Sequence, residues 1–148
     1  MESQMNRVLL AVLALTSASG PAIAEDLHGT LYKNPNCQCC EQHADYLRKN
    51  SIDLDVVPAA NLDELSTEAG VPSDLQGCHM IKLGGYVFEG HITAEIIKRF
   101  LAEKPTDVVG LSIPGMPSGV PGMEGKKTGS YAVYAIHKDG TRTIYATE

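Results

Sequence analysis

Three of the four cysteines in this chain of 148 residues lie within four positions, at Cys37, Cys39 and Cys40. They follow an apolar stretch at residues 30–32 and precede a segment with helical periodicity, so the thiols fall at a strand-to-helix junction. The partial positive charge at a helix N-terminus lowers the pKa of a thiol and favours the thiolate. Because a thiolate is both a nucleophile and a ligand for soft metals, the cluster predicts either metal binding or redox chemistry.

The first 24 residues are typical of a cleaved secretory signal. Arg7 precedes an apolar run at residues 8–15 that is too short to span a bilayer, and Ala22-Ile23-Ala24 forms a small-x-small cleavage site. An uncleaved membrane anchor is the alternative. We therefore predict an exported protein with no membrane association after signal cleavage.

Residues 25–148 are long enough for a single domain with its own core. The formal net charge of −6 and the lack of a basic stripe argue against a nucleic-acid partner. The same charge would not repel a cation.

Hydrophobic patterning predicts an α/β fold for residues 27–104. The expected order is strand, helix, strand, helix, strand, strand, helix. The strands are expected at 28–33, 53–57, 80–83 and 86–89. The first helix is expected at 39–49, the second after an N-cap at Asn61 with Glu64 in a capping box, and the third from an N-cap at Thr93 to the stop at Pro105. A Cys-x-x-Cys spacing near the first strand–helix junction of this order is typical of a thioredoxin-like core.

The last third of the chain has a different character. Residues 105–130 are rich in glycine and proline, show no periodicity, and repeat Pro114-Gly115-Met116 as Pro121-Gly122-Met123. A loop is therefore expected here. It is followed by an added β-hairpin at residues 131–146, in which Asp139-Gly140 makes the turn.

The hairpin around Gly84-Gly85 predicts where the fourth cysteine lies. A two-residue turn pairs Leu83 with Tyr86 and Met80 with Glu89, and the same register extended places Cys78 opposite His91. In the expected topology this third strand starts at the sheet edge where the first strand ends. Cys78, His79 and His91 should therefore gather near the cysteine cluster.

Together these residues form a set of soft metal ligands. Thiolate with thioether selects Cu(I), whereas thiolate with imidazole alone also suits zinc, and adjacent thiolates suggest several bridged copper ions per chain. Other residues have a structural explanation: Met80 is expected in the core, His43 is expected to be solvated, and Glu89 is expected on the hairpin without a role at His91. The predicted metal ligands are Cys37, Cys39, Cys40, Cys78, His79, His91, Met116 and Met123.

Two other uses of the cysteines stay open, structural disulfides and thiol–disulfide exchange. Adjacent cysteines scarcely pair with each other, but a Cys37–Cys40 bond across one helical turn is possible. In an oxidoreductase Cys37 would be the attacking thiolate and Cys40 the resolving one. Against that role, Cys78 stands where thioredoxins carry a cis-proline, and Cys39 would compete as a second resolving thiol. Whether the protein is an enzyme is therefore open.

The combination of Cys37-Gln-Cys-Cys40, Cys78-His79, Glu89-Gly90-His91 and the two Pro-Gly-Met repeats resembles the exported, thioredoxin-like copper-resistance proteins called CopG. The resemblance covers residues 27–148 in order, although Gln38 stands where that family usually has glycine. It implies a periplasmic protein of Gram-negative bacteria that serves copper or silver tolerance, with a Cu(I) centre on the four cysteines. Other periplasmic copper-handling proteins are the partners that it implies.

Overall fold

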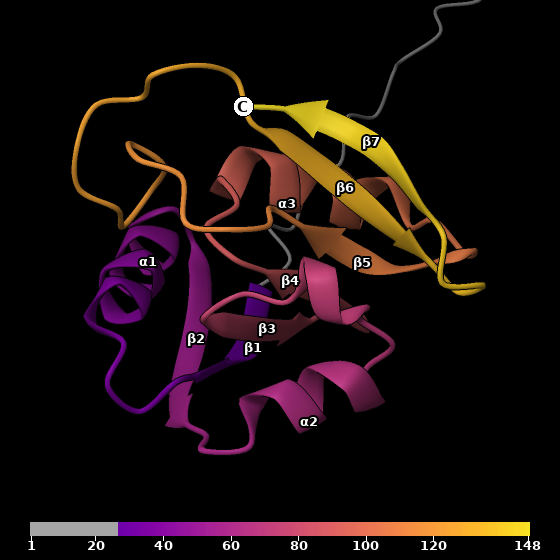
Figure 1. Ribbon diagram of the computed structural model, residues 1–148, viewed down its shortest axis with the longest axis horizontal. Coiled ribbons are helices and arrows are strands. Elements are labelled where there is room, and N and C mark those ends of the chain that lie inside the picture. The colour runs from indigo at the N-terminus through magenta and orange to yellow at the C-terminus, as the bar shows by residue number, and fades with distance from the viewer. Residues whose placement is uncertain (1–26) are drawn as a thin grey trace, which may run out of the picture.

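The computed structural model describes residues 27–148, so the predicted signal at residues 1–24 lies outside the described part. The described chain folds around one seven-stranded sheet with the order β2-β1-β3-β4-β5-β6-β7 (Figure 1). Its elements are β1 (Leu27–Lys33), α1 (Gln38–Lys49), β2 (Ile52–Pro58), α2 (Leu62–Glu68), the 3₁₀ turn η1 (Ser73–Leu75), β3 (His79–Leu83), β4 (Tyr86–Glu89), α3 (Ala94–Glu103), β5 (Val108–Ser112), β6 (Ala132–His137) and β7 (Arg142–Thr147).

The first part of the chain has the predicted α/β order, with each strand and helix start within two residues of its expected place. Strand β1 runs parallel to β2 and antiparallel to β3, and β3 runs antiparallel to β4. The predicted hairpin register is confirmed, because Leu83 pairs with Tyr86 and Met80 with Glu89. The two-residue turn at Gly84-Gly85 fixes that register.

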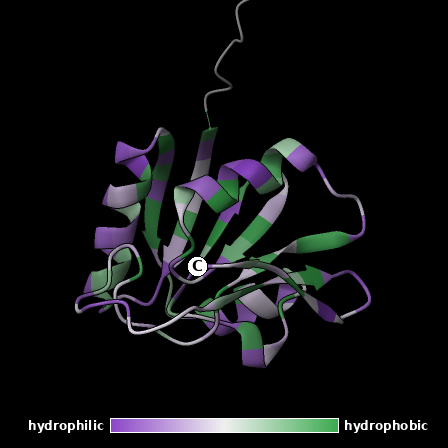
Figure 2. Cartoon of the chain, turned by 90° about the horizontal axis from the view of Figure 1, so that it is seen from above, coloured by the Kyte–Doolittle hydropathy of each residue, from purple (hydrophilic) through white to green (hydrophobic). Residues whose placement is uncertain are grey.

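The two faces of the sheet carry separate apolar clusters because successive side chains of a strand point to opposite faces. Ile81 and Phe88 pack with Leu47 of α1 and Phe100 of α3 on one face. Met80 packs with Leu62 of α2 on the other. Figure 2 shows mainly hydrophobic strands, whereas the helices also carry hydrophilic residues. Met80 is fully buried, as the core role predicts.

The expectation that residues 105–130 form only an irregular loop is wrong for β5. This strand runs parallel to β4 and antiparallel to β6, so it joins the C-terminal hairpin to the main sheet. A Cβ atom on Gly110 would lie 1.7 Å from the Val87 carbonyl oxygen, so only glycine fits this close approach of two strands. The glycine that the sheet requires also interrupts the strand pattern in the sequence.

Asn61 stands at the N-cap of α2 as predicted, but its side chain makes no capping hydrogen bond. Thr93 likewise does not cap α3 with its side chain. Instead, the Thr93 amide donates to Glu148 Oε1 at 2.7 Å, and the Ala94 amide donates to the Tyr46 hydroxyl at 3.3 Å. Contacts between distant segments therefore replace the local cap. Among residues 27–148 no helix is long and apolar enough to cross a membrane.

Candidate metal centre

The cysteine-bearing turn is held between the end of β1 and the start of β3. Cys37 is the N-cap of α1, and Cys39 and Cys40 lie in its first turn. The Asn34 amide donates to the Cys78 carbonyl oxygen at 3.1 Å, and the Cys37 amide donates to the Asn34 carbonyl oxygen at 3.0 Å. These two bonds tie the segment before α1 to the residue before β3, and so bring the two cysteine-bearing segments together.

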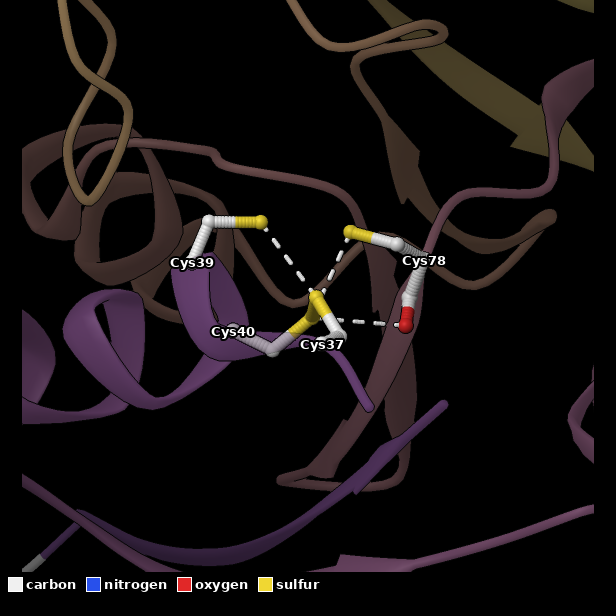
Figure 3. A group of neighbouring side chains, drawn as sticks. All are labelled: Cys37, Cys39, Cys40 and Cys78. Atoms are coloured by element: carbon white, nitrogen blue, oxygen red, sulfur yellow. Dashed lines mark hydrogen bonds between the residues drawn. A yellow bond between two sulfur atoms is a disulfide. The ribbon is translucent and has the colours of Figure 1, made fainter. Parts of the chain in front are cut away.

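All four cysteine sulfurs lie within 4.8 Å of one another (Figure 3). Cys37 and Cys40 form a disulfide, whereas Cys39 and Cys78 are free thiols. The Cys39 sulfur is 3.3 Å from the Cys37 sulfur, and the Cys78 sulfur is 3.4 Å from the Cys40 sulfur. The structure therefore brings together the four predicted sulfur ligands, in a form in which two of them are bonded to each other.

The pKa of the Cys78 thiol is raised, in contrast to the lowered pKa expected for thiols at the N-terminus of α1. Burial, together with the charge and hydrogen bonding of Cys39, raises the pKa of Cys78 to about 12. Cys78 is therefore a protonated thiol in the disulfide form of the protein. A metal ion that binds its sulfur has to displace that proton.

Two imidazoles face the same thiol. The Cys78 sulfur is 3.6 Å from His79 Nδ1 and 3.8 Å from His91 Nε2, and these three ligand atoms lie within 4.8 Å of one another. His91 Nδ1 donates to the Pro121 carbonyl oxygen at 2.7 Å, so its Nε2 keeps a lone pair. Burial lowers the pKa of both imidazoles, that of His79 well below its ordinary value. Neutral imidazole is the form that binds a metal.

The prediction that His43 is solvated is wrong, because its side chain is fully buried. His43 Nδ1 lies 2.9 Å from His79 Nε2, and His43 Nε2 lies 3.0 Å from the Ile92 carbonyl oxygen. Burial and the neighbouring His91 lower the pKa of His43 to about 3. The spacing from Cys40 could have predicted this burial, since a residue three positions later in a helix lies on the same side.

The methionines of the Pro-Gly-Met repeats lie in different environments. Met123 packs against the core cluster that contains Cys40, and the Pro121 carbonyl oxygen accepts the hydrogen bond from His91. Met116 is 61% exposed. The loop therefore reaches the cysteine site through its second repeat.

Glu89 was expected on the hairpin, and it is fully buried. Its Oε2 accepts a hydrogen bond from the Gly77 amide at 3.0 Å, and its Oε1 has no partner among the described residues. Burial raises the pKa of Glu89 to about 7. This carboxyl group thus holds the backbone just before Cys78.

Comparison with known proteins identifies one family model and two solved structures that are similar to this chain. Residues 75–123 match a family model described as a protein of unknown function, DUF411. Two solved structures, both of the copper resistance protein CopG and titled form 1 and form 2, are 30% identical to this chain. The chain belongs to the CopG-like copper-resistance family.

The likeness to the two CopG structures extends over most of the chain. Each aligns with 84% of this chain and with 98% or 99% of its own, at a TM-score of 0.77. The mixed α/β fold is therefore shared across the CopG chain. No curated protein matches the sequence.

Proposed function

We propose that this CopG-family protein serves copper resistance in the periplasm by holding Cu(I) as cargo on Cys37, Cys39, Cys40 and Cys78. The observation that supports this most strongly is the gathering of four cysteine sulfurs within 4.8 Å of one another from two distant segments. The two solved relatives, both structures of a copper resistance protein, point the same way.

The donor set favours a soft monovalent ion. Four thiolates outnumber the ligands that one Cu(I) commonly needs, so sulfurs shared between several copper ions fit the cluster. His79 and His91 add nitrogen donors beside Cys78. Met123 packs against the core cluster that contains Cys40 and is the nearer methionine to offer a thioether. Met116, which is exposed, would reach the site only after the loop moves.

The Cys37–Cys40 disulfide gives the proposed site two forms that differ by two electrons and two protons. Only the reduced form offers four thiolates. Two Cu(II) ions could take one electron each from the Cys37 and Cys40 thiols, which would release two protons, form the disulfide and leave two Cu(I) ions. Sequestration, relay and redox conversion of copper all use the same four sulfurs.

Competition with a Cu(I)-selective chelator under anaerobic conditions tests this function. We expect the reduced protein to bind more than one Cu(I) per chain, and the disulfide form to bind fewer. The Cys39→Ser and Cys78→Ser variants should each lower the stoichiometry, whereas Met80→Leu, which changes a buried thioether of the other core cluster, should not. Tight, single and tetrahedral binding of zinc alone would contradict the proposal.

The disulfide also supports a second candidate, a thiol–disulfide oxidoreductase in which Cys37 attacks and Cys40 resolves. The Cys39→Ser variant distinguishes the two candidate functions. Reduction of a disulfide substrate should need Cys37 and tolerate Cys39→Ser, whereas copper stoichiometry should fall in that variant. Turnover that survives Cys39→Ser in a protein without Cu(I) affinity would favour the oxidoreductase.

The periplasmic location rests on residues 1–24, which we propose to be a signal peptide. N-terminal sequencing of protein from the periplasmic fraction should begin near Glu25. A mature protein that retains Arg7 would instead support a membrane anchor.

A further inference from the structure

A chain of hydrogen bonds runs from a backbone carbonyl group through two buried imidazoles to the candidate metal centre. The Ile92 carbonyl oxygen lies 3.0 Å from His43 Nε2, His43 Nδ1 lies 2.9 Å from His79 Nε2, and His79 Nδ1 lies 3.6 Å from the Cys78 sulfur. His43 and His79 are both fully buried. The contacts of each nitrogen determine where the protons sit.

The first contact fixes the tautomer of His43. A carbonyl oxygen only accepts hydrogen bonds, so His43 Nε2 must carry the proton that it donates to Ile92. A charged imidazolium is costly in a buried site without a carboxylate partner, so the ring is neutral and its Nδ1 holds a lone pair.

The second contact transfers this constraint to His79. Because His43 Nδ1 accepts, His79 Nε2 must donate, and a neutral His79 then has no proton on Nδ1. The lone pair of His79 Nδ1 faces the Cys78 sulfur. His91 reaches the same arrangement separately, since its Nδ1 donates to Pro121 and its Nε2 faces Cys78.

We propose that His43 is a positioning residue of the metal centre: by accepting a hydrogen bond from His79 Nε2–H, it holds the His79 Nδ1 lone pair toward Cys78 as a ready nitrogen ligand for Cu(I). This inference rests on the proposed copper function. Partners that orient a ligating histidine typically change metal affinity about 10–100-fold when they are removed.

Two polar variants of His43 separate its two contacts. In His43→Asn the amide oxygen stands in for imidazole Nδ1, so the bond from His79 is kept and the contact with Ile92 is lost. In His43→Gln the amide group stands in for Nε2, so the contact with Ile92 is kept and the acceptor for His79 is lost. Both variants carry an uncharged amide, and circular dichroism checks that each folds.

The first measurement is a long-range ¹H–¹⁵N spectrum of the metal-free disulfide form, which distinguishes protonated from unprotonated imidazole nitrogens. In the wild type, His43 and His79 should both carry their proton on Nε2. His43→Asn should preserve this tautomer of His79, and His43→Gln should shift His79 toward the Nδ1–H form. A wild-type His79 with its proton on Nδ1 would overturn the proposal.

The second measurement is Cu(I) affinity of the reduced proteins. His43→Gln should weaken binding about 10–100-fold, and His43→Asn should stay close to the wild type. Equal losses in the two variants would mean that His43 only fills space. If the wild type itself binds no Cu(I), the copper function fails, while the tautomers of the metal-free protein still decide whether His43 orients His79.

Discussion

Gly122 lies directly against the backbone of His43. A Cβ atom on Gly122 would stand 2.7 Å from the His43 amide nitrogen and 3.0 Å from the Cys39 carbonyl oxygen. The second Pro-Gly-Met repeat therefore packs on the first turns of α1, and the neighbouring Pro121 carbonyl reaches His91. One close backbone contact couples the loop to the helix that carries the cysteines.

Gly122→Ala should separate the loop from α1. Gly122 has a φ of +81°, so alanine would be strained by about 1 kcal/mol from its backbone conformation alone, and the clash with His43 adds to this. Gly115→Ala is a matched control, because Gly115 has a φ of +77° and nothing within 4 Å of the added methyl group. Guanidinium denaturation should show the larger loss of unfolding free energy at Gly122, and only that variant should lose Cu(I) affinity. Equal effects would refute the coupling.

Lys33→Met should destabilise the turn before the cysteine cluster. The Lys33 side chain is only 6% exposed, and its Nζ donates to the carbonyl oxygens of Pro35 at 3.1 Å and Cys37 at 3.2 Å. Hydrogen bonds from a charged donor contribute more than neutral ones, so we expect a loss of about 2 kcal/mol in the free energy of unfolding. Lys98→Met, at an exposed position of α3, should change it little. A loss at Lys33 no larger than that at Lys98 would contradict this role.

The part of the site that sequence could predict depends on local geometry. The Gly84-Gly85 turn sets the pairing of Met80 with Glu89, and alternation along the strands then places Cys78 near His91. The cysteine cluster could be placed because a strand breaker, a helix start and three thiols lie within a few residues. These inferences need no knowledge of how the last third of the chain packs.

What sequence could not predict depends on contacts between distant segments. His43 is buried because β3 and the residues after β4 lie over its ring, and neither is local to α1. Strand β5 contains Gly110, whose lack of a side chain suits the approach to Val87 but weakens the strand pattern. Asn61 and Thr93 stand at the predicted N-cap positions of α2 and α3, but neither side chain makes a capping hydrogen bond. At α3 distant partners, including Glu148, take the place of the local side chain.

Glu89→Gln should change how stability depends on pH in the metal-free protein. Burial raises the pKa of Glu89 from 4.5 to about 7, so between these values the folded chain holds a proton that the unfolded chain has lost. The wild-type free energy of unfolding therefore falls as pH rises through this window, by at most about 3 kcal/mol from this group. The glutamine variant lacks this loss.

The informative quantity is the difference in unfolding free energy between Glu89→Gln and the wild type, because the buried histidines contribute equally to both. This difference should rise in favour of the variant from pH 4.5 to pH 7 and then level off. Glu64→Gln, at an exposed position of α2, controls for the loss of a surface charge. Parallel curves for Glu89→Gln and the wild type would show that Glu89 ionises normally.

Met123→Leu and Met116→Leu test which methionine serves the copper site. Leucine keeps the apolar volume of methionine and removes the thioether sulfur. Met123 packs against the core cluster that contains Cys40, whereas Met116 is 61% exposed, so only Met123→Leu should weaken Cu(I) binding, by about tenfold or 1.4 kcal/mol. Competition with a Cu(I) chelator measures both variants under the same conditions. A greater loss at Met116 would mean that the first repeat, not the second, closes over bound copper, and that the loop rearranges when the metal binds.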